Sequence, residues 1–262
     1  MSANTTIVDK IHGSLTGLHS TAETIGLPKA IKNKVVSFYQ RRVKKTYILN
    51  AEDSRYPLIC RYNSSDQYVF ETVFDQNEYG CLNDVQNVRL IVDCGANVGY
   101  SSAYFLTRFP QANIIAIEPD SNNFNIMKRN LKSYGDRVTS YNAGVWSETT
   151  GLKVCRGTYR DGLAWATQVR KCLPDETPDV QAVDIGTILR NSGFDKIDIL
   201  KIDIERSEIE LFARNFSHWL GKTRNLVIEL HDKECEDVFY KAISGYPFTL
   251  SKSLEVVVCK SA

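Results

Sequence analysis

Two pairs of ionisable residues close two apolar segments late in the chain. Asp203 and Glu205 end "LKIDIE", and Glu229 and His231 end "VIELH". Residues two apart in an extended strand point to the same side, so each pair presents both side chains to one face. The carboxyl ends of neighbouring strands are where open α/β sheets bind ligands. We therefore predict that these residues form the reaction centre, with His231, Asp203, Glu205 and Glu229 as the catalytic groups.

A second stretch, Leu90–Leu106, joins a strand-like apolar run to a helical repeat through a glycine-bearing turn. Gly95 and Gly99 are separated by three residues, so the turn is not G-x-G-x-x-G, and no Lys-Ser or Lys-Thr pair follows to make a P-loop. Glycine still lets the backbone approach a ligand, and the helix amides that follow favour an anionic group such as a carboxylate. Glu118 ends the next apolar run, where an acidic side chain can accept both hydroxyls of a ribose.

The composition is that of an ordinary globular protein, with 262 residues, 43% hydrophobic and 24% charged. A net charge of +1 argues against nucleic acid as the main partner. No basic and apolar leader opens the chain, and no run approaches the roughly 18 apolar residues of a membrane helix, so we expect a cytoplasmic protein without a membrane span. The seven cysteines form no C-x-x-C pair, which favours reduced thiols over a disulfide framework or a zinc ribbon.

From residue 88 onward, strand-like runs alternate with stretches of helical spacing, which predicts a parallel sheet with helices on both faces. One helix is expected to begin at Ser121, and another to run from Ile209 to Leu220. Residues 161–183 are poorly periodic and contain two prolines, so we expect a long surface excursion there. The ending "FTLSKSLEVVVCKSA" predicts an antiparallel hairpin. The expected strands are "RLIVDCG", "ANIIAIEPD", "VTSYNAGVW", "KIDILKIDIE" and "RNLVIELHD".

Residues 1–88 are predicted to form an N-terminal appendage, and residues 89–262 the main domain. The appendage is expected to contain a helix with Ile31, Val35 and Phe38 on one face. "KTYILNAE" and "YPLICRYN" follow as a hairpin, and "SSDQYVFETVFDQNEYG" as a helix or turn that begins with cap-type residues. We expect the appendage to act as a substrate lid.

Five blocks of the chain, quoted at the end of this paragraph, resemble the FkbM family of S-adenosylmethionine-dependent methyltransferases. The resemblance covers roughly residues 67–258 and implies the class I methyltransferase fold, which is α/β and doubly wound with a mostly parallel seven-stranded sheet. It also implies O-methylation of a hydroxyl on a small molecule or natural product, such as a polyketide, peptide or sugar. Arg206 and Ser207 stand where the family has a glycine and an alanine. The matching blocks are "VDCGANVGYSS", "AIEPDSNNF", "NAGVWSETTG", "LKIDIERSEIE" and, more weakly, "VIELH".

The resemblance assigns the residues that bind the cofactor, S-adenosylmethionine. The turn after the first strand is expected around the methionine part, and Glu118 at the ribose. Tyr79 is expected to close over the methionine end, whereas Trp146 could wall in the adenine or equally be a core residue. The full expected set is Tyr79, Asp93, Gly95, Ala96, Asn97, Gly99, Ser101, Glu118, Pro119, Asp120, Asn142, Ala143, Trp146 and Asp203.

For such an enzyme we expect in-line attack of a substrate oxygen on the sulfonium methyl group. His231, with an ordinary pKa of about 6.5, is the natural general base, and Asp203 or Glu205 could orient it or take the proton instead. The same groups could hold a divalent cation that lowers the pKa of the substrate hydroxyl. The residues do not decide between base and metal. The metal-free version is slightly favoured, so no metal ligand is assigned.

Other functions stay open on the residues alone. Nitrogen could be the methylated atom, and a nicotinamide-dependent oxidoreductase would also place an acid at Glu118. The missing G-x-G-x-x-G and the terminal hairpin argue against the oxidoreductase. A noncatalytic binding module could keep the same fold. The expected acceptor is a small molecule or a carrier-bound or peptide substrate, and a homodimer is compatible with the sequence.

Overall fold

The computed structural model describes residues 45–156 and 167–261. The contacts within the chain separate Met1–Tyr47 from a larger unit, Ile48–Ala262. The predicted helix with Ile31, Val35 and Phe38 lies outside the described residues. The division near residue 88 and the lid role of the preceding segment stay predictions. None of the described helices is long and apolar enough to cross a membrane.

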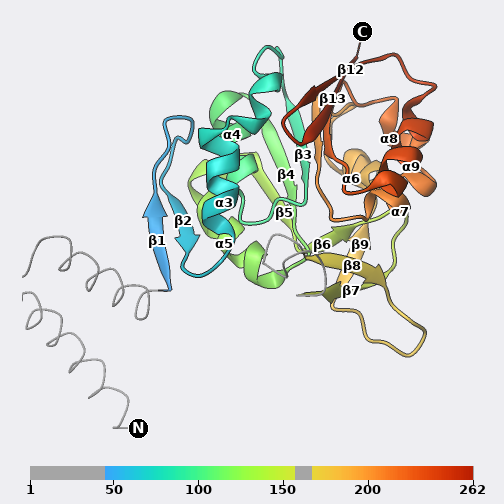
Figure 1. Ribbon diagram of the computed structural model, residues 1–262, viewed down its shortest axis with the longest axis horizontal. Coiled ribbons are helices and arrows are strands. Elements are labelled where there is room, and N and C mark those ends of the chain that lie inside the picture. The colour runs from blue at the N-terminus through green and yellow to red at the C-terminus, as the bar shows by residue number, and fades with distance from the viewer. Residues whose placement is uncertain (1–44, 157–166, 262) are drawn as a thin grey trace, which may run out of the picture. The chain divides into compact units, whose positions relative to one another are not determined.

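The larger unit is built on a seven-stranded sheet in the order β12-β13-β11-β10-β3-β4-β5 (Figure 1). The five strands from β11 to β5 in this order are parallel, and β13 is antiparallel to both β11 and β12. This confirms the predicted fold class, a doubly wound α/β sheet that ends in an antiparallel hairpin. The strands are β3 (Leu90–Cys94), β4 (Asn113–Ile117), β5 (Val138–Tyr141), β10 (Ile199–Ile202), β11 (Asn225–Glu229), β12 (Phe248–Ser253) and β13 (Val256–Ser261).

Successive residues of the central strands alternate between two cores, one on each face of the sheet. Ile91 and Ile199 belong to one buried cluster, whereas Val92 and Leu200 belong to the other. This period of two is why the central strands carry apolar residues on both of their faces. The first core packs against α4 (Tyr100–Arg108) and α5 (Ser121–Leu131), and the second against α6 (Ile185–Asn191), α7 (Glu208–Ala213), α8 (Ser217–Leu220) and α9 (Lys233–Ile243).

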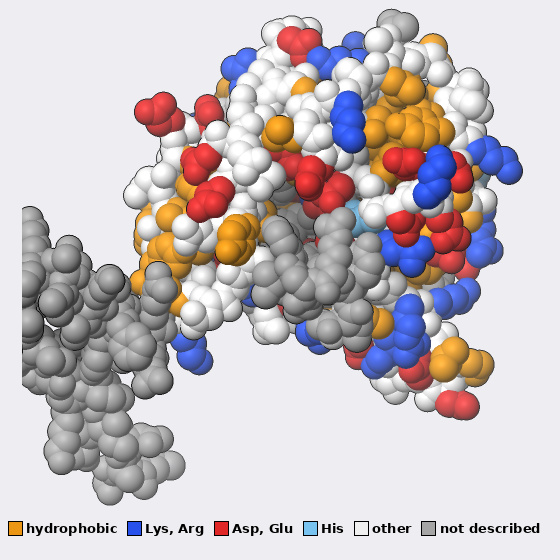
Figure 2. Space-filling view, viewed as in Figure 1, with side chains coloured by type: hydrophobic (Ala, Val, Ile, Leu, Met, Phe, Trp, Pro, Cys, Tyr) orange, Lys and Arg blue, Asp and Glu red, His pale blue; other side chains and the backbone are white. Residues whose placement is uncertain are grey.

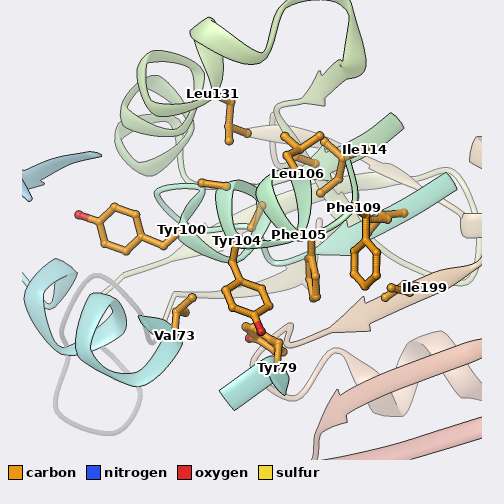
Figure 3. Close-up of a cluster of buried hydrophobic side chains, with 14 of the residues drawn as sticks. Val73, Tyr79, Tyr100, Tyr104, Phe105, Leu106, Phe109, Ile114, Leu131 and Ile199 are labelled. Atoms are coloured by element: carbon orange, nitrogen blue, oxygen red, sulfur yellow. The ribbon is translucent and has the colours of Figure 1, made fainter. Parts of the chain in front are cut away.

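The segment before β3 packs its apolar side chains into the first core. Phe70, Phe74 and Tyr79 lie against aromatic residues of α4, with Tyr79 and Phe105 ring centroids 5.1 Å apart (Figure 3). The predicted pair of strands is present as a two-stranded sheet, and the predicted helix or turn follows it. These elements are β1 (Thr46–Leu49), β2 (Leu58–Arg61), α3 (Asp66–Phe70), the π-helical η1 (Glu71–Asp75) and the 3-10 η2 (Glu78–Leu82).

Two predictions about the middle of the chain are wrong. "VTSYNAGVW" is not one strand, because it divides between β5 and β6 (Ala143–Val145), and β6 belongs to a separate four-stranded sheet. The described part of the expected excursion is not irregular either, since it supplies two strands of that sheet, which cover a small core around Trp146. Pairing with distant strands therefore outweighs the weak local pattern. The other strands are β7 (Gly151–Cys155), β8 (Gln168–Lys171) and β9 (Val180–Val183).

The single helix predicted from Ile209 to Leu220 is also wrong, since the structure has two short helices, α7 and α8. Arg214 between them is extended, and Asn215 has a left-handed φ of +62°. The Asn215 side-chain amide donates a hydrogen bond of 2.8 Å to the carbonyl of Ser147. A contact from another part of the chain thus stabilises the break in a stretch whose apolar spacing is helical.

Candidate active site

A cavity of about 230 Å³ lies where the sheet order reverses, and residues at the carboxyl ends of β3, β4, β10 and β11 line it. This is the position at which open α/β sheets bind ligands. Figure 2 shows Asp and Glu side chains gathering near the middle of one face. The structure thus brings members of both predicted residue sets to one cavity. The predicted residues that line it are Tyr79, Gly95, Ala96, Asn97, Ser101, Glu118, Pro119, Ala143, Asp203, Glu205 and Glu229.

Asp93 supports the turn after β3 from within the protein. Its fully buried carboxylate accepts hydrogen bonds from the hydroxyls of Ser101 and Ser102 at 2.7 and 2.6 Å. The Nζ of Lys201 lies 3.4 Å from the other carboxylate oxygen. Of these groups, Ser101 and Lys201 line the cavity and Asp93 stands behind them. Asp93 therefore fixes the start of α4.

The two glycines of the turn serve different contacts. Gly95 has a φ of +79°, and a Cβ there would lie 1.7 Å from the carbonyl oxygen of Asp203, so only glycine lets the ends of β3 and β10 approach. Gly99 has a φ of +86°, and a Cβ there would lie 3.0 Å from Met127 on α5. Gly95 thus shapes the cavity, whereas Gly99 lets two helices pack.

Glu118 ends β4 with its carboxylate directed back at the turn. It is 4% exposed, and its two oxygens accept backbone hydrogen bonds from Asn97 at 2.9 Å and Asp120 at 2.8 Å. Burial raises the pKa of Glu118 to about 7, although these two donors act in the opposite direction. The Oδ1 of Asn97 is buried and has no hydrogen-bond partner among the described residues.

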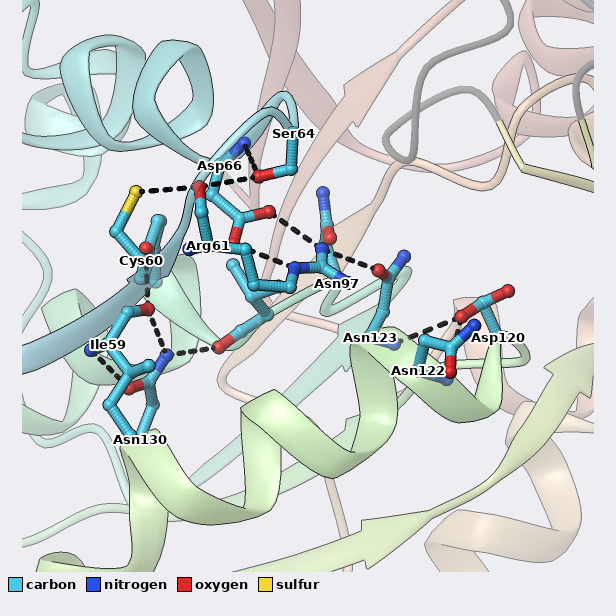
Figure 4. A network of polar contacts seen from close by, with 12 residues as sticks. Ile59, Cys60, Arg61, Ser64, Asp66, Asn97, Asp120, Asn122, Asn123 and Asn130 are labelled. Atoms are coloured by element: carbon cyan, nitrogen blue, oxygen red, sulfur yellow. Dashed lines mark hydrogen bonds and ion pairs between the residues drawn. The ribbon is translucent and has the colours of Figure 1, made fainter. Parts of the chain in front are cut away.

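The backbone around Glu118 is held by Asp120 and Asn142. Asp120 caps α5, since its Oδ1 accepts from the amides of Asn122 and Asn123 at 2.7 and 3.0 Å (Figure 4). Asn142 donates to the carbonyls of Glu118 and Pro119 at 2.9 and 3.0 Å. Asp120 and Asn142, both predicted to contact the cofactor, thus position the β4–α5 turn.

A polar network links this turn to β2. Arg61 pairs with Asp66 at 2.7 Å and donates to the side chain of Asn123 at 2.8 Å (Figure 4). Asn123 in turn lies 3.5 Å from Glu118 and lines the cavity. The segment before β3 is therefore bonded to the wall of the cavity.

The imidazole of His231 lies at the centre of a group of carboxylates. Its Nε2 is 3.4 Å from Glu205, 3.6 Å from Asp203 and 3.6 Å from Glu229. On the opposite side of the ring, Nδ1 is 3.3 Å from Glu208, which is fully buried. The structure thus brings the four residues that we predict to be catalytic close together and adds Glu208 to the group.

The charges around His231 determine its protonation. Burial alone would lower the pKa of His231, but the neighbouring carboxylates of Glu205 and Glu208, with the charge of Asp203, raise it to about 12. The side chain has no exposed surface. Without another cation in the cluster, the imidazole is therefore protonated at neutral pH.

Lys201 lies between the turn and the carboxylate group. Its Nζ donates to the carbonyl of Gly95 at 2.7 Å and lies 3.4 Å from both Asp93 and Asp203. Burial by itself would lower the pKa of Lys201, but Asp203 and Asp93 raise it above its ordinary value. The buried ammonium therefore stays charged and neutralises part of the acidic group.

The turn after β10 has a strained backbone. Glu205 and Arg206 have left-handed φ angles of +51° and +74°, conformations that cost L residues on the order of 1 kcal/mol each. Arg206 occupies the position at which the resemblance implies a glycine. Its side chain points to the β11–α9 loop and pairs with Asp232 at 2.5 Å and Glu234 at 2.9 Å.

Trp146 belongs to the core of the four-stranded sheet. Of the two roles predicted for it, adenine wall or core residue, the structure shows the core residue.

Sequence reasoning missed several residues of the site. Lys201 and Glu208 both lie inside the block "LKIDIERSEIE", but nothing in their spacing marked them as buried. Glu78 is 5% exposed and lines the cavity from η2.

Residues 93–243 match the family model described as the methyltransferase FkbM domain. The chain belongs to this family. The match spans more than half of the chain and confirms the predicted resemblance. The protein is thus a methyltransferase with the class I fold, and such folds use S-adenosylmethionine in general.

Relatives with curated names agree with this assignment. Methyltransferase sdnD of Sordaria araneosa is 28% identical over 198 residues, which span 62% of this chain and 74% of that protein. Methyltransferase 1 of Beauveria bassiana is 26% identical over a match that spans 55% of this chain and 65% of that protein. The AMB antimetabolite synthetase AmbE of Pseudomonas aeruginosa is 24% identical, and the match covers 64% of this chain but 10% of the synthetase.

Among solved structures, a precorrin-6y C5,15-methyltransferase from Geobacter metallireducens aligns with a TM-score of 0.42 and 10% identity. The alignment covers 76% of this chain and 90% of that one. A likeness at this level carries no argument of its own. The fold class rests on the strand order and the family match.

Proposed function

We propose that this FkbM protein binds S-adenosylmethionine in the cavity and transfers the methyl group to a hydroxyl oxygen of a small-molecule, carrier-bound or peptide acceptor. One observation carries the proposal: Glu118 and the acidic group of Asp203, Glu205 and Glu229 line the same cavity. S-Adenosylmethionine supplies a methyl group on a positively charged sulfur. In the cavity, Glu118 can therefore accept hydrogen bonds from the ribose hydroxyls, and the acidic group supplies negative charge near the sulfonium.

The residues at the Glu118 wall fit the donor. Glu118 is already oriented by two backbone amides, so it can accept ribose hydroxyls without reorganising. The buried Oδ1 of Asn97 has no hydrogen-bond partner among the described residues and can accept from an ammonium group. Ser101 lines the cavity at the start of α4, where helix amides favour the methionine carboxylate.

At the other wall, residues of the chain position the acceptor and take its proton. As the new C–O bond forms, the hydroxyl proton must leave. Glu229 lines the cavity, whereas His231 lies behind the carboxylates with no exposed side-chain surface. We therefore assign the proton to the Glu229 carboxylate and give His231 the role of holding the acidic group together. In-line alignment of the hydroxyl with the methyl group supplies much of the remaining rate.

The class of acceptor is supported by one of the relatives. AmbE is named as a synthetase of an antimetabolite, and the match spans a tenth of its length. The matching segment is thus part of an enzyme that is named for the synthesis of an antimetabolite. On this basis we place the acceptor among natural products.

Calorimetry with S-adenosylmethionine and with its demethylated product tests the donor. We expect both to bind wild-type protein, and Glu118→Ala to weaken binding by roughly tenfold to a hundredfold, because a carboxylate–hydroxyl hydrogen bond contributes about 1.5–3 kcal/mol. Asp136→Asn, a change at an exposed carboxylate, is the matched control and should bind like wild type. If neither compound binds folded wild-type protein, the proposal is wrong. NMR of a methylated product then separates oxygen from nitrogen as the acceptor atom.

A further inference from the structure

The spacing around His231 Nε2 is unusual for a hydrogen-bonded imidazole. Three carboxylates approach this nitrogen at 3.4–3.6 Å, beyond the 2.7–3.2 Å of ordinary N–H···O hydrogen bonds. The ring is completely buried, yet neither nitrogen forms a hydrogen bond of acceptable geometry with the described residues. A buried polar ring surrounded by acceptors at this distance requires an explanation.

The same spacing is that of ligands that share a metal ion. For metal–ligand bonds of about 2.1 Å, neighbouring ligand atoms lie roughly 3.0–3.5 Å apart in octahedral or tetrahedral geometry. One ligand atom each from Asp203, Glu205 and His231 lies within 4.8 Å of the other two. These distances are compatible with ligand atoms that share one ion.

Glu208 provides a separate geometric argument. It lies 3.3 Å from Nδ1, on the side of the ring away from the other carboxylates, and its Oε1 also accepts from the backbone amide of Ile204 at 3.0 Å. A buried carboxylate beside Nδ1 favours the tautomer that keeps its proton on Nδ1 and leaves the Nε2 lone pair available, which is the usual support of a metal-bound imidazole. Here that lone pair faces Asp203, Glu205 and Glu229.

We propose that Asp203, Glu205 and His231 Nε2 bind a divalent metal ion that accepts mixed oxygen and nitrogen ligands, of the Mn²⁺ or Zn²⁺ type. Glu208 is a positioning residue that fixes the imidazole, and Glu229 stays on the cavity side. One imidazole together with carboxylates is a ligand set that these ions accept. It differs from the thiolate ligands of structural zinc sites. The buried Lys201 ammonium lies 3.4 Å from Asp203 and limits the excess negative charge.

The catalytic role of this ion rests on the proposed function. Bound beside the acceptor hydroxyl, the ion stabilises the developing alkoxide while Glu229 takes the proton. The oxygen lone pair forms the C–O bond, and the electron pair of the S–CH₃ bond stays on sulfur. The donor becomes a neutral thioether, so no oxidant or reductant is needed.

Metal binding can be measured without the methyl donor. The full chain is treated with chelator, dialysed and titrated with Mn²⁺ by calorimetry, with loss of the free Mn²⁺ electron paramagnetic resonance signal as a second readout, and then with Zn²⁺. We expect one ion per chain. His231→Ala and Asp203→Asn should abolish binding, and Glu208→Gln should weaken it by roughly tenfold to a hundredfold. Asp237→Asn, at an exposed carboxylate on α9, should bind like wild type.

Wild-type protein that binds neither ion at millimolar concentration would overturn the proposal, and this result needs no variant. Binding that survives in both folded His231→Ala and folded Asp203→Asn, judged by circular dichroism, would overturn it as well. Affinity for the demethylated donor, measured on the same samples, separates the two proposals. If the donor fails to bind and the metal binds, the proposed function is lost and the metal site stands.

Discussion

Buried carboxylates have opposite surroundings at the two walls of the cavity, the Glu118 wall and the His231 wall. At one wall the single carboxylate of Glu118 is surrounded by neutral N–H donors, whose bonds hold its two oxygens in place. At the other, the carboxylates of Asp203, Glu205, Glu208 and Glu229 surround one imidazole at distances too long for hydrogen bonds. Neutral donors orient a carboxylate for a neutral ligand, whereas crowded carboxylates need positive charge to remain ionised together.

This difference separates binding from chemistry. Changes at the Glu118 wall should alter the affinity for the donor, and changes at the His231 wall should alter turnover. Gly95 lies between them, since it lets the end of β3 approach the end of β10.

The largest effect is expected where the two walls meet. Gly95→Ala places a Cβ 1.7 Å from the carbonyl oxygen of Asp203, at a φ that L residues avoid. We expect a loss of stability of about 3 kcal/mol or more. Gly193→Ala is the matched control, because Gly193 has a φ of +77° but nothing within 4 Å of its Cβ position, and should cost about 1 kcal/mol. Thermal unfolding measures both, and equal losses would remove the steric argument.

Turnover should depend on the His231 wall alone. His231→Ala should lower kcat by roughly a hundredfold or more, because the imidazole holds the acidic group that includes Glu229, and assisted proton removal contributes a factor of this size. The dissociation constant of the demethylated donor should stay within about threefold of wild type, because donor binding depends on the Glu118 wall. A threefold change corresponds to less than about 1.4 kcal/mol, which is tenfold in affinity. Calorimetry and an initial-rate assay on one sample check this. A parallel loss of donor affinity would show that the walls are not independent.

Glu118 should give a pH-dependent stability difference of several degrees. Its pKa in the folded protein is raised from 4.5 to about 7, so the folded state binds the extra proton between these values. The stability that Glu118 contributes is therefore present below about pH 4.5 and is lost as the pH rises through about 7. The melting temperature of Glu118→Gln minus that of wild type should grow between about pH 5 and about pH 8. A Glu118→Gln profile that stays flat over this range would refute the shift.

The smallest effect is expected at Arg206. Arg206→Gly relieves a left-handed backbone but loses exposed ion pairs with Asp232 and Glu234, and the two effects are of similar size. The net change in unfolding free energy should lie within about 1 kcal/mol. Glu234→Gln, which removes only one ion-pair partner, is the control. A loss above about 2 kcal/mol, beyond what exposed pairs contribute, would mean that Arg206 holds the cluster together.

Local patterns in the sequence were sufficient for the main sheet and for much of the site. Apolar runs predicted β3, β4, β10 and β11, and the rule that parallel strands bind ligands at their carboxyl ends brought Glu118, Glu205 and His231 to one region. The start of α5 at Ser121 was correct, because Asp120 is a strong N-cap.

The remaining features depend on contacts between distant residues. The separation of β6 from β5 follows from pairing with β9, and the break between α7 and α8 is stabilised by a bond from Asn215 to Ser147. Neither has a local signal strong enough to outweigh a continuous apolar pattern. The core role of Trp146 is likewise a result of the second sheet.

The sequence by itself determined most strands of the main sheet, the order in which they carry carboxylates and glycine turns, and the family to which the chain is related. Only the tertiary structure decided what those carboxylates face. Asp93 and Asp120 support turns, Glu118 accepts two amides, and Glu208 turns His231 toward three other carboxylates. The physical reason is that strand and helix periods arise from local geometry, whereas the charge state and partners of a buried group depend on atoms that folding brings from elsewhere in the chain.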